Sequence, residues 1–161
     1  MEARGELENT VIVGVTDHYT YGYKNTQELM TLSGVEHEQL LEKVPFFLWS
    51  ADSPDVDVEK TVCTADVLPT VLNLMGIDSA YHYLGQDAFD PDYVGYAIFP
   101  DGSWTSEGIF CQIVDNQPLL LMNTYNKPVT TEDHQKMAQI ARDFISTSNL
   151  LLTSDYYKEV R

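Results

Sequence analysis

Asp17 and His18 are the residues of this chain whose types and position are best suited to chemistry. They follow a continuous β-branched run over residues 10–15, which predicts a strand buried on both faces of a parallel sheet. The carboxyl end of such a strand is where α/β proteins usually place ligands. A carboxylate and an imidazole are both ligands for zinc or manganese, so the pair is a candidate metal half-site. The dipeptide alone also fits a loop-capping Asp17 beside an ordinary surface histidine.

The other three histidines have weaker patterns. His37, His82 and His134 have no carboxylate or cysteine at a spacing that marks a metal site, so packing or exposure is expected for each. His134 falls in the first turn of an expected helix and is predicted to be solvated. No serine lies in a GxSxG elbow, and no glycine-rich phosphate loop is present.

Aromatic and cationic side chains follow the Asp–His pair directly. Tyr19, Tyr21 and Tyr23 could line a path for a substrate, but alternating tyrosines also pack on half-buried segments, and both interpretations stand. Lys24 could contact an anion there, although a solvated lysine is the commoner outcome.

The elements that must position these residues alternate between strands and helices. A short helix is expected with Thr26 as its N-terminal cap and Gly34 as its stop signal, followed by a helical turn over residues 36–42. A second buried strand is predicted over residues 44–49, and the acidic residues 51–59 predict an exposed loop.

Further along, the hydrophobic pattern changes from helix to short strands. A helix begins near Asp66, which can cap it, and ends at Gly76. Short strands separated by turn signals over residues 93–122 predict a small antiparallel meander. An amphipathic helix capped by Thr130 or Thr131 follows.

This order of elements predicts an α/β fold in two parts. Residues 1–92 are expected to form part of an α/β core, a partial sheet with flanking helices. Residues 93–161 are expected to form a β-meander and a C-terminal helix, packed as one unit with the core.

The composition of the chain limits the classes of partner that it can bind. The 161 residues are 43% hydrophobic, and 25 acidic against 9 basic residues give a net charge of −16. Such a surface repels phosphate backbones and argues against nucleic acid binding and unaided docking on anionic lipid. No apolar run is long enough for a membrane span, so this chain is expected to be soluble and not membrane-inserted. Cys63 and Cys111 suggest neither a disulfide framework nor a cysteine metal site, and their redox state stays open.

Several segments together resemble one known family. The chain is similar to the lipoteichoic acid synthase-like branch of the alkaline phosphatase and sulfatase superfamily, in which a strand ends in a GDH-type motif and is followed by a VPF strand, a DxLPTLLNLxGI helix, a GxD segment and a GSW turn. The matching segments here are residues 9–18, Val44-Pro45-Phe46, TVCTADVLPTVLNLMGI over 61–77, Gly85-Gln86-Asp87 and Gly102-Ser103-Trp104. One departure is Thr16, where the family usually has glycine.

The resemblance implies a function and a cofactor. Asp17 and His18 would be two ligands of a divalent metal, most often manganese and in relatives zinc or calcium, bound weakly by this chain alone. Family members carry their nucleophile and a further acidic ligand well upstream of the GDH-type motif. The chain is therefore expected to be the C-terminal part of a phosphoglycerol transferase or sulfatase-like hydrolase, to lack the nucleophile, and to be inactive alone.

The resemblance also implies partners and a location. The expected partner is the N-terminal half of the catalytic domain, and the parent would act on phosphate or sulfate esters from a membrane-anchored, extracellular position. Strands exposed without that half predict self-association.

Two other functions remain open. The chain could be a non-catalytic acidic interaction module with a vestigial metal site, which a stable monomer without metal response would support. A self-sufficient phosphatase completed across a dimer would instead show turnover that Asp17→Ala abolishes.

Overall fold

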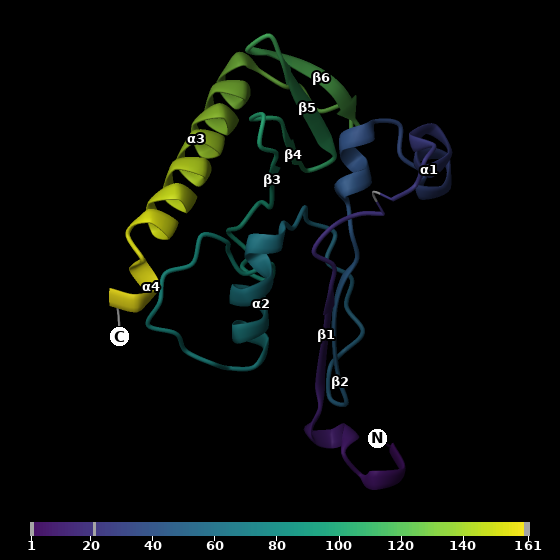
Figure 1. Cartoon of the computed structure of the whole chain (residues 1–161), viewed down its shortest axis with the longest axis vertical. Helices are drawn as coiled ribbons and strands as arrows, with labels where there is room; N and C mark the ends of the chain where they lie inside the picture. Colours follow the sequence, from purple (N-terminus) through teal and green to yellow (C-terminus); the bar gives the residue numbers. More distant parts are fainter. Residues whose placement is uncertain (1, 21, 160–161) are drawn as a thin grey trace. The chain divides into compact units, whose positions relative to one another are not determined.

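The structure, a computed structural model, describes residues 2–20 and 22–159 and divides the chain into the units Met1–Val56 and Asp57–Arg161. Figure 1 shows the elements of each unit. The expected division between residues 92 and 93 falls inside the second unit. Together the units give the predicted mixed α/β fold, with a two-stranded sheet, a four-stranded meander and a C-terminal helix.

The first unit contains one strand pair and short helices. Its elements are η1 (Glu2–Arg4), η2 (Leu7–Asn9), β1 (Val11–Val15), α1 (Thr26–Ser33), η3 (Glu38–Glu42) and β2 (Phe46–Ser50).

The predicted parallel, fully buried strand is wrong for β1. Strand β1 pairs antiparallel with β2, with Val13 opposite Leu48, and β1 side chains such as Ile12 remain about two-fifths exposed. The helices of this unit lie beyond the strand ends rather than over the strand faces (Figure 1), so they leave the apolar residues uncovered. A continuous apolar run indicates that a strand should be covered on both faces. The described elements of the first unit do not provide this cover.

Local signals in this unit are confirmed with a one-residue shift. Asn25, not Thr26, caps α1, because its Oδ1 accepts a hydrogen bond from the Glu28 backbone N–H at 3.2 Å. Gly34 ends the helix with a left-handed φ of 67°, as its position predicted.

The second unit contains the larger sheet and the long helix. Its elements are η4 (Thr64–Asp66), α2 (Val67–Leu74), β3 (Ala97–Ile98), β4 (Trp104–Ser106), β5 (Ile109–Val114), β6 (Gln117–Asn123), α3 (Thr131–Thr153) and α4 (Tyr156–Glu159).

The predicted meander is confirmed, with strand order β3-β4-β5-β6 and every neighbouring pair antiparallel. Asp115 and Asn116 make the β5–β6 turn with positive φ at both residues, as a two-residue hairpin turn of type I′ requires. Phe110 and Cys111 on β5 are fully buried, and Ala141 of α3 is buried as well. This sheet and helix form the main core of the unit.

Candidate functional site

The predicted metal pair lies directly after β1. The Nδ1 atom of His18 is 2.8 Å from the Tyr19 carbonyl oxygen, and since a carbonyl only accepts, Nδ1 carries the proton in the neutral ring. Nε2 is then the unprotonated nitrogen, the atom suited to bind a metal. It lies 3.5 Å from Oδ1 of Asp17. The Tyr19 carbonyl thus orients the His18 ring, and the Asp17 carboxylate lies close to its unprotonated nitrogen Nε2.

This separation fits joint ligation of one ion. Zinc binds histidine nitrogen and carboxylate oxygen at about 2.0–2.2 Å, so two ligands of one ion lie within roughly 4.3 Å of each other. The observed 3.5 Å lies within that limit. The side chains of His18 and Asp17 are 52% and 91% exposed, and the described residues contain no group of three metal-binding side chains. The pair is therefore compatible with an open half-site rather than an enclosed metal centre.

A hollow of about 150 Å³ adjoins the pair on the His18 side. Its walls come from the segment after β1, from α1, and from residues 41–45, which lead into β2. Leu29 and Leu41 contribute apolar surface, while Thr16, His18, Thr20, Ser33 and Lys43 contribute polar groups.

Two residues that line this hollow, Thr16 and the exposed Lys43, stand out because their polar side-chain atoms have no partner among the described residues. The Oγ1 atom of Thr16 is buried and makes no hydrogen bond within the described structure. Lys43 forms no ion pair with any described residue. The sequence offered no local signal for Lys43, which reaches the site only because the chain folds back into β2.

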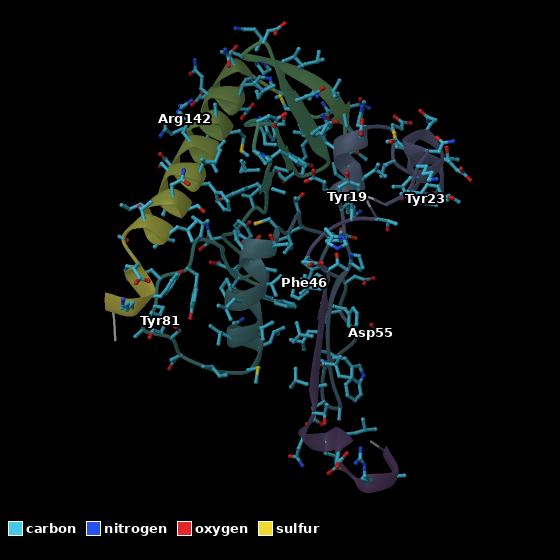
Figure 2. All side chains as sticks on the ribbon, in the orientation of Figure 1. Tyr19, Tyr23, Phe46, Asp55, Tyr81 and Arg142 are labelled. Atoms are coloured by element: carbon cyan, nitrogen blue, oxygen red, sulfur yellow. The ribbon has the colours of Figure 1, made fainter. Side chains whose placement is uncertain are left out.

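The residues expected around the pair separate into lining and exposed ones. Tyr19 lines the hollow, whereas Tyr23 is 41% exposed; both are labelled in Figure 2. Tyr21 lies outside the described residues. Lys24 is exposed and does not line the hollow, whereas Lys43, which is also exposed, does.

Two of the remaining histidines fit the expectation of packing or exposure: His82 is exposed and His37 is half-buried. The expected solvation of His134 is wrong. Its Nδ1 lies 3.6 Å from Cys111 Sγ, and its ring contacts the buried Trp104 edge-on at 6.0 Å between centroids. The first turn of α3 packs against the sheet, which partly covers this histidine.

Asp66, expected only as a helix cap, is a buried junction in the second unit. It is 1% exposed, and its carboxylate accepts hydrogen bonds from Cys63 N–H at 2.9 Å, Gln86 N–H at 2.8 Å and the Tyr93 hydroxyl at 2.9 Å. These donors come from three separate segments. The predicted side-chain cap of α2 is wrong: Asp66 makes no cap hydrogen bond to that helix, and its bond to Cys63 belongs to a capping box of the preceding turn η4. The other two bonds are long-range contacts that the sequence could not indicate.

Two further residues of the segment 61–77 hold the loop after α2 against this helix. Thr70 Oγ1 accepts a bond from Ala88 N–H at 2.9 Å, and Asn73 donates to Asp87 Oδ2 at 2.7 Å. A Cβ at Gly85 would lie 2.1 Å from the Ala65 carbonyl oxygen, so only glycine fits there. The segments 61–77 and 85–88 thus have a structural role, because their hydrogen bonds hold a loop against α2.

Burial and the Asp66 charge also suppress ionisation nearby. Burial, followed by the Asp66 carboxylate, raises the pKa of the Cys63 thiol to about 11. The same two causes raise the pKa of Tyr93 well above its usual range. Neither group is suited to act as a nucleophile at neutral pH.

The comparisons with known proteins agree with the family resemblance of the sequence motifs. No family model matches the chain. It is 26% identical to a lipoteichoic acid synthase of Staphylococcus saprophyticus over 96% of its length, and 26% identical to lipoteichoic acid synthase 2 of Bacillus subtilis over 63% of its length. The predicted resemblance is confirmed. The chain is thus similar to lipoteichoic acid synthases over most of its length.

The matches cover most of this chain but only a small part of each relative. The chain spans 24% of the staphylococcal synthase and 17% of the Bacillus synthase, so the similarity covers one part of these longer proteins. Within residues 2–20 and 22–159, no helix is both long and apolar enough to cross a membrane.

Proposed function

We propose that this chain forms part of a metal-dependent phosphoglycerol transferase or sulfatase-like hydrolase and supplies Asp17 and His18 as two ligands of its divalent metal. The observation that carries the proposal is the 3.5 Å separation of Asp17 Oδ1 and His18 Nε2, with the tautomer set by the Tyr19 carbonyl. Manganese is the preferred candidate, with zinc or calcium as alternatives.

The pair's role in the reaction is to hold the ion. When bound, such an ion neutralises negative charge on a phosphoryl or sulfuryl group in transfer. The Tyr19 carbonyl fixes the His18 ring, as second partners of metal-binding histidines generally do. The exposed Asp17 carboxylate leaves room for ligands from elsewhere in the parent protein.

The chain by itself is proposed to be inactive. Two ligands hold a metal weakly, and no serine, threonine or cysteine lies in a recognisable nucleophile motif. The remaining ligands and the nucleophile would come from the N-terminal half of the catalytic domain. The parent is proposed to act at the outer side of the cell membrane on a phosphate or sulfate ester.

Calorimetric titration with Mn²⁺ and Zn²⁺ tests the metal pair. We expect weak binding that the Asp17→Ala, His18→Ala double variant abolishes. The matched control is Asp78→Ala, His82→Ala, which removes an exposed aspartate and an exposed histidine and should bind as the unchanged protein does. Equal binding by all three proteins would refute the pair as the site.

A non-catalytic interaction module is the second candidate. The 91% exposure of the Asp17 side chain favours it, because a functional metal ligand is usually more enclosed. No metal binding by the unchanged protein, together with a stable monomer, would select this function.

A further inference from the structure

The last turn of α3 exposes leucines on opposite sides of the helix. Leu150 and Leu152 are 64% and 78% exposed, and Leu151 between them is half-buried. Successive residues of an α-helix are rotated by about 100°, so Leu150 and Leu152 point away from each other. A flat protein surface covers one side of a helix, whereas an apolar medium covers all sides. The arrangement therefore favours entry of this helix end into a lipid layer over packing against a flat partner.

Charge is missing from the same part of α3. Residues 144–154 contain no Asp, Glu, Lys or Arg, although these four types make up 21% of the chain. The first charged residue after this segment, Asp155, is paired with Lys158, whose Nζ lies 3.3 Å from Asp155 Oδ2. Charged side chains oppose contact with lipid tails, so this segment is the part of α3 best suited to such contact.

Polar groups of this turn form hydrogen bonds within the helix. Thr153 Oγ1 donates to the Asn149 carbonyl oxygen at 2.8 Å, and the Ser154 N–H donates to the Leu150 carbonyl oxygen at 2.9 Å. Groups that are already hydrogen-bonded cost less to remove from water than free ones. The turn can therefore leave water at a lower cost than its content of hydroxyl groups suggests.

Two tyrosines follow the leucines in α4. Tyr156 and Tyr157 pack edge-on with 5.1 Å between their ring centroids, and Tyr157 is 43% exposed. Tyrosine is enriched where a membrane meets water, because its ring is apolar and its hydroxyl is polar. The four-stranded sheet lies near the opposite end of α3 (Figure 1), so it does not cover these leucines and tyrosines.

We infer that the last turn of α3 is a lipid-contacting surface, which enters the headgroup region of a bilayer through Leu150 and Leu152. One helical turn rises about 5.4 Å, comparable with the roughly 5–10 Å to which interfacial helices enter a membrane. The contact is shallow and weak, because it buries few side chains. Zwitterionic lipid is the partner, since anionic headgroups repel a chain of charge −16. The surface shares no residue with the Asp17–His18 pair and goes beyond the proposed function.

Flotation of the full chain with phosphatidylcholine vesicles tests the surface. We expect weak binding, and Leu150→Ser, Leu152→Ser should lower the partition coefficient about tenfold or more, because two exposed apolar side chains are lost. The matched control is Leu32→Ser, Leu68→Ser, which removes leucines that are 70% and 50% exposed on α1 and α2. It should leave the partition coefficient unchanged. No binding by the unchanged protein, or equal losses in both variants, overturns the proposal.

The lipid composition provides a second test. Replacing part of the phosphatidylcholine by phosphatidylglycerol should weaken binding, and added salt should restore it by screening the repulsion. Stronger binding to the anionic vesicles would overturn the inference, because leucines do not attract a charged headgroup.

A tryptophan introduced by Leu152→Trp reports whether the turn reaches the lipid tails. Brominated tails should quench its emission above the baseline that Trp49 and Trp104 give in the unchanged protein. Leu32→Trp, on α1, should show no added quenching. Equal quenching of both introduced tryptophans would overturn the location of the contact.

Two further measurements separate this surface from the metal pair and from a second copy of the chain. Mn²⁺ binding should be the same in Leu150→Ser, Leu152→Ser as in the unchanged protein, so the lipid surface and the metal pair can fail independently. Sedimentation velocity without vesicles should also be the same for both proteins. Self-association that this double variant abolishes, together with no vesicle binding by the unchanged protein, would assign the leucines to a second copy and overturn the lipid surface.

Discussion

The Asp66 carboxylate holds three segments of the second unit through three hydrogen bonds while almost completely buried. In Asp66→Asn, an amide N–H₂ would face at least one donor, leaving a buried donor unsatisfied. Hydrogen bonds to charged groups contribute about 1.5–3 kcal/mol each, so we expect the free energy of unfolding to fall by at least that amount. Urea denaturation followed by circular dichroism measures it.

Asp78→Asn is the control for this change, since Asp78 is exposed in the same unit. It should alter the free energy of unfolding by less than about 0.5 kcal/mol. Equal effects of the two substitutions would mean that Asp66 is not a junction.

Cys63 should react slowly for its degree of exposure. Its pKa lies at about 11 in the folded protein against 9.0 in an unperturbed thiol, so at pH 8 the thiolate fraction is roughly a hundredfold lower. Alkylation by iodoacetamide, measured for each cysteine by peptide mass spectrometry, should be correspondingly slower in the folded chain than in urea. Comparable rates in both states would contradict the burial of this thiol.

The same shift predicts how stability depends on alkaline pH. A thiol whose pKa is raised on folding keeps its contribution to stability below pH 9.0 and loses it as pH rises toward 11, because only the unfolded chain ionises in that interval. The melting temperature should therefore decline over this interval, and less so in Cys63→Ala.

At the scale of elements, α3 begins with a capping box. Thr130 N–H donates to Asp133 Oδ2 at 2.8 Å, and Asp133 N–H donates to Thr130 Oγ1 at 3.2 Å. These bonds to Thr130, first from its backbone and then from its side chain, lower the pKa of Asp133. A lowered carboxyl pKa contributes stability above its unfolded value and loses it as pH falls through the folded pKa.

An acid titration of helix content tests this cap. The far-ultraviolet circular dichroism should lose helical signal as pH falls below about 3.8, and Asp133→Ala should lack this component. Glu132→Ala, in the same first turn, should retain it. A similar acid profile in both variants would assign the titration to other carboxylates.

The elements that sequence could predict are those set by local chemistry. The Gly34 helix stop, the Thr130 cap and the Asp115-Asn116 turn each depend on a few neighbouring residues. The partner of β1 could not be predicted, because a continuous apolar run specifies burial but not strand direction.

The candidate site likewise has some features that the sequence predicts and others that only the fold brings together. Asp17 and His18 are adjacent in sequence, so their proximity was predictable. Lys43 and Thr16 are 27 positions apart in the sequence, and only the fold brings them to the same hollow. The long-range bonds of Asp66 to Gln86 and Tyr93 were hidden for the same reason.

At the scale of the whole molecule, the two units differ in core. Among the described residues, Leu41 is the one buried apolar side chain of the first unit, whereas the second unit buries several, including Trp104 and Phe110. We expect a fragment of residues 57–161 to unfold cooperatively and a fragment of residues 1–56 to show no sharp transition, since small cores and two-stranded sheets are marginal. Scanning calorimetry of both fragments checks this, and a sharp transition for 1–56 alone would contradict it.

Self-association is expected from the strand pair. Both strands of a two-stranded sheet have an unpaired edge, and β1 exposes apolar side chains such as Val13. Sedimentation velocity should show association that grows with salt, which screens repulsion between chains of charge −16. Val13→Lys should weaken it, whereas Leu152→Lys, at a residue 78% exposed on α3, should not. A monomer at all concentrations would end this expectation.

The two tryptophans of the chain lie in different units and in different surroundings. Trp49 of β2 is 39% exposed, and Trp104 of β4 is 3% exposed and in contact with His134. The protein therefore contains two natural optical reporters, one partly exposed to water and the other in an apolar interior. With Trp49→Phe and Trp104→Phe as single-emitter references, the spectrum of an unlabelled sample can show which unit responds first to metal or denaturant.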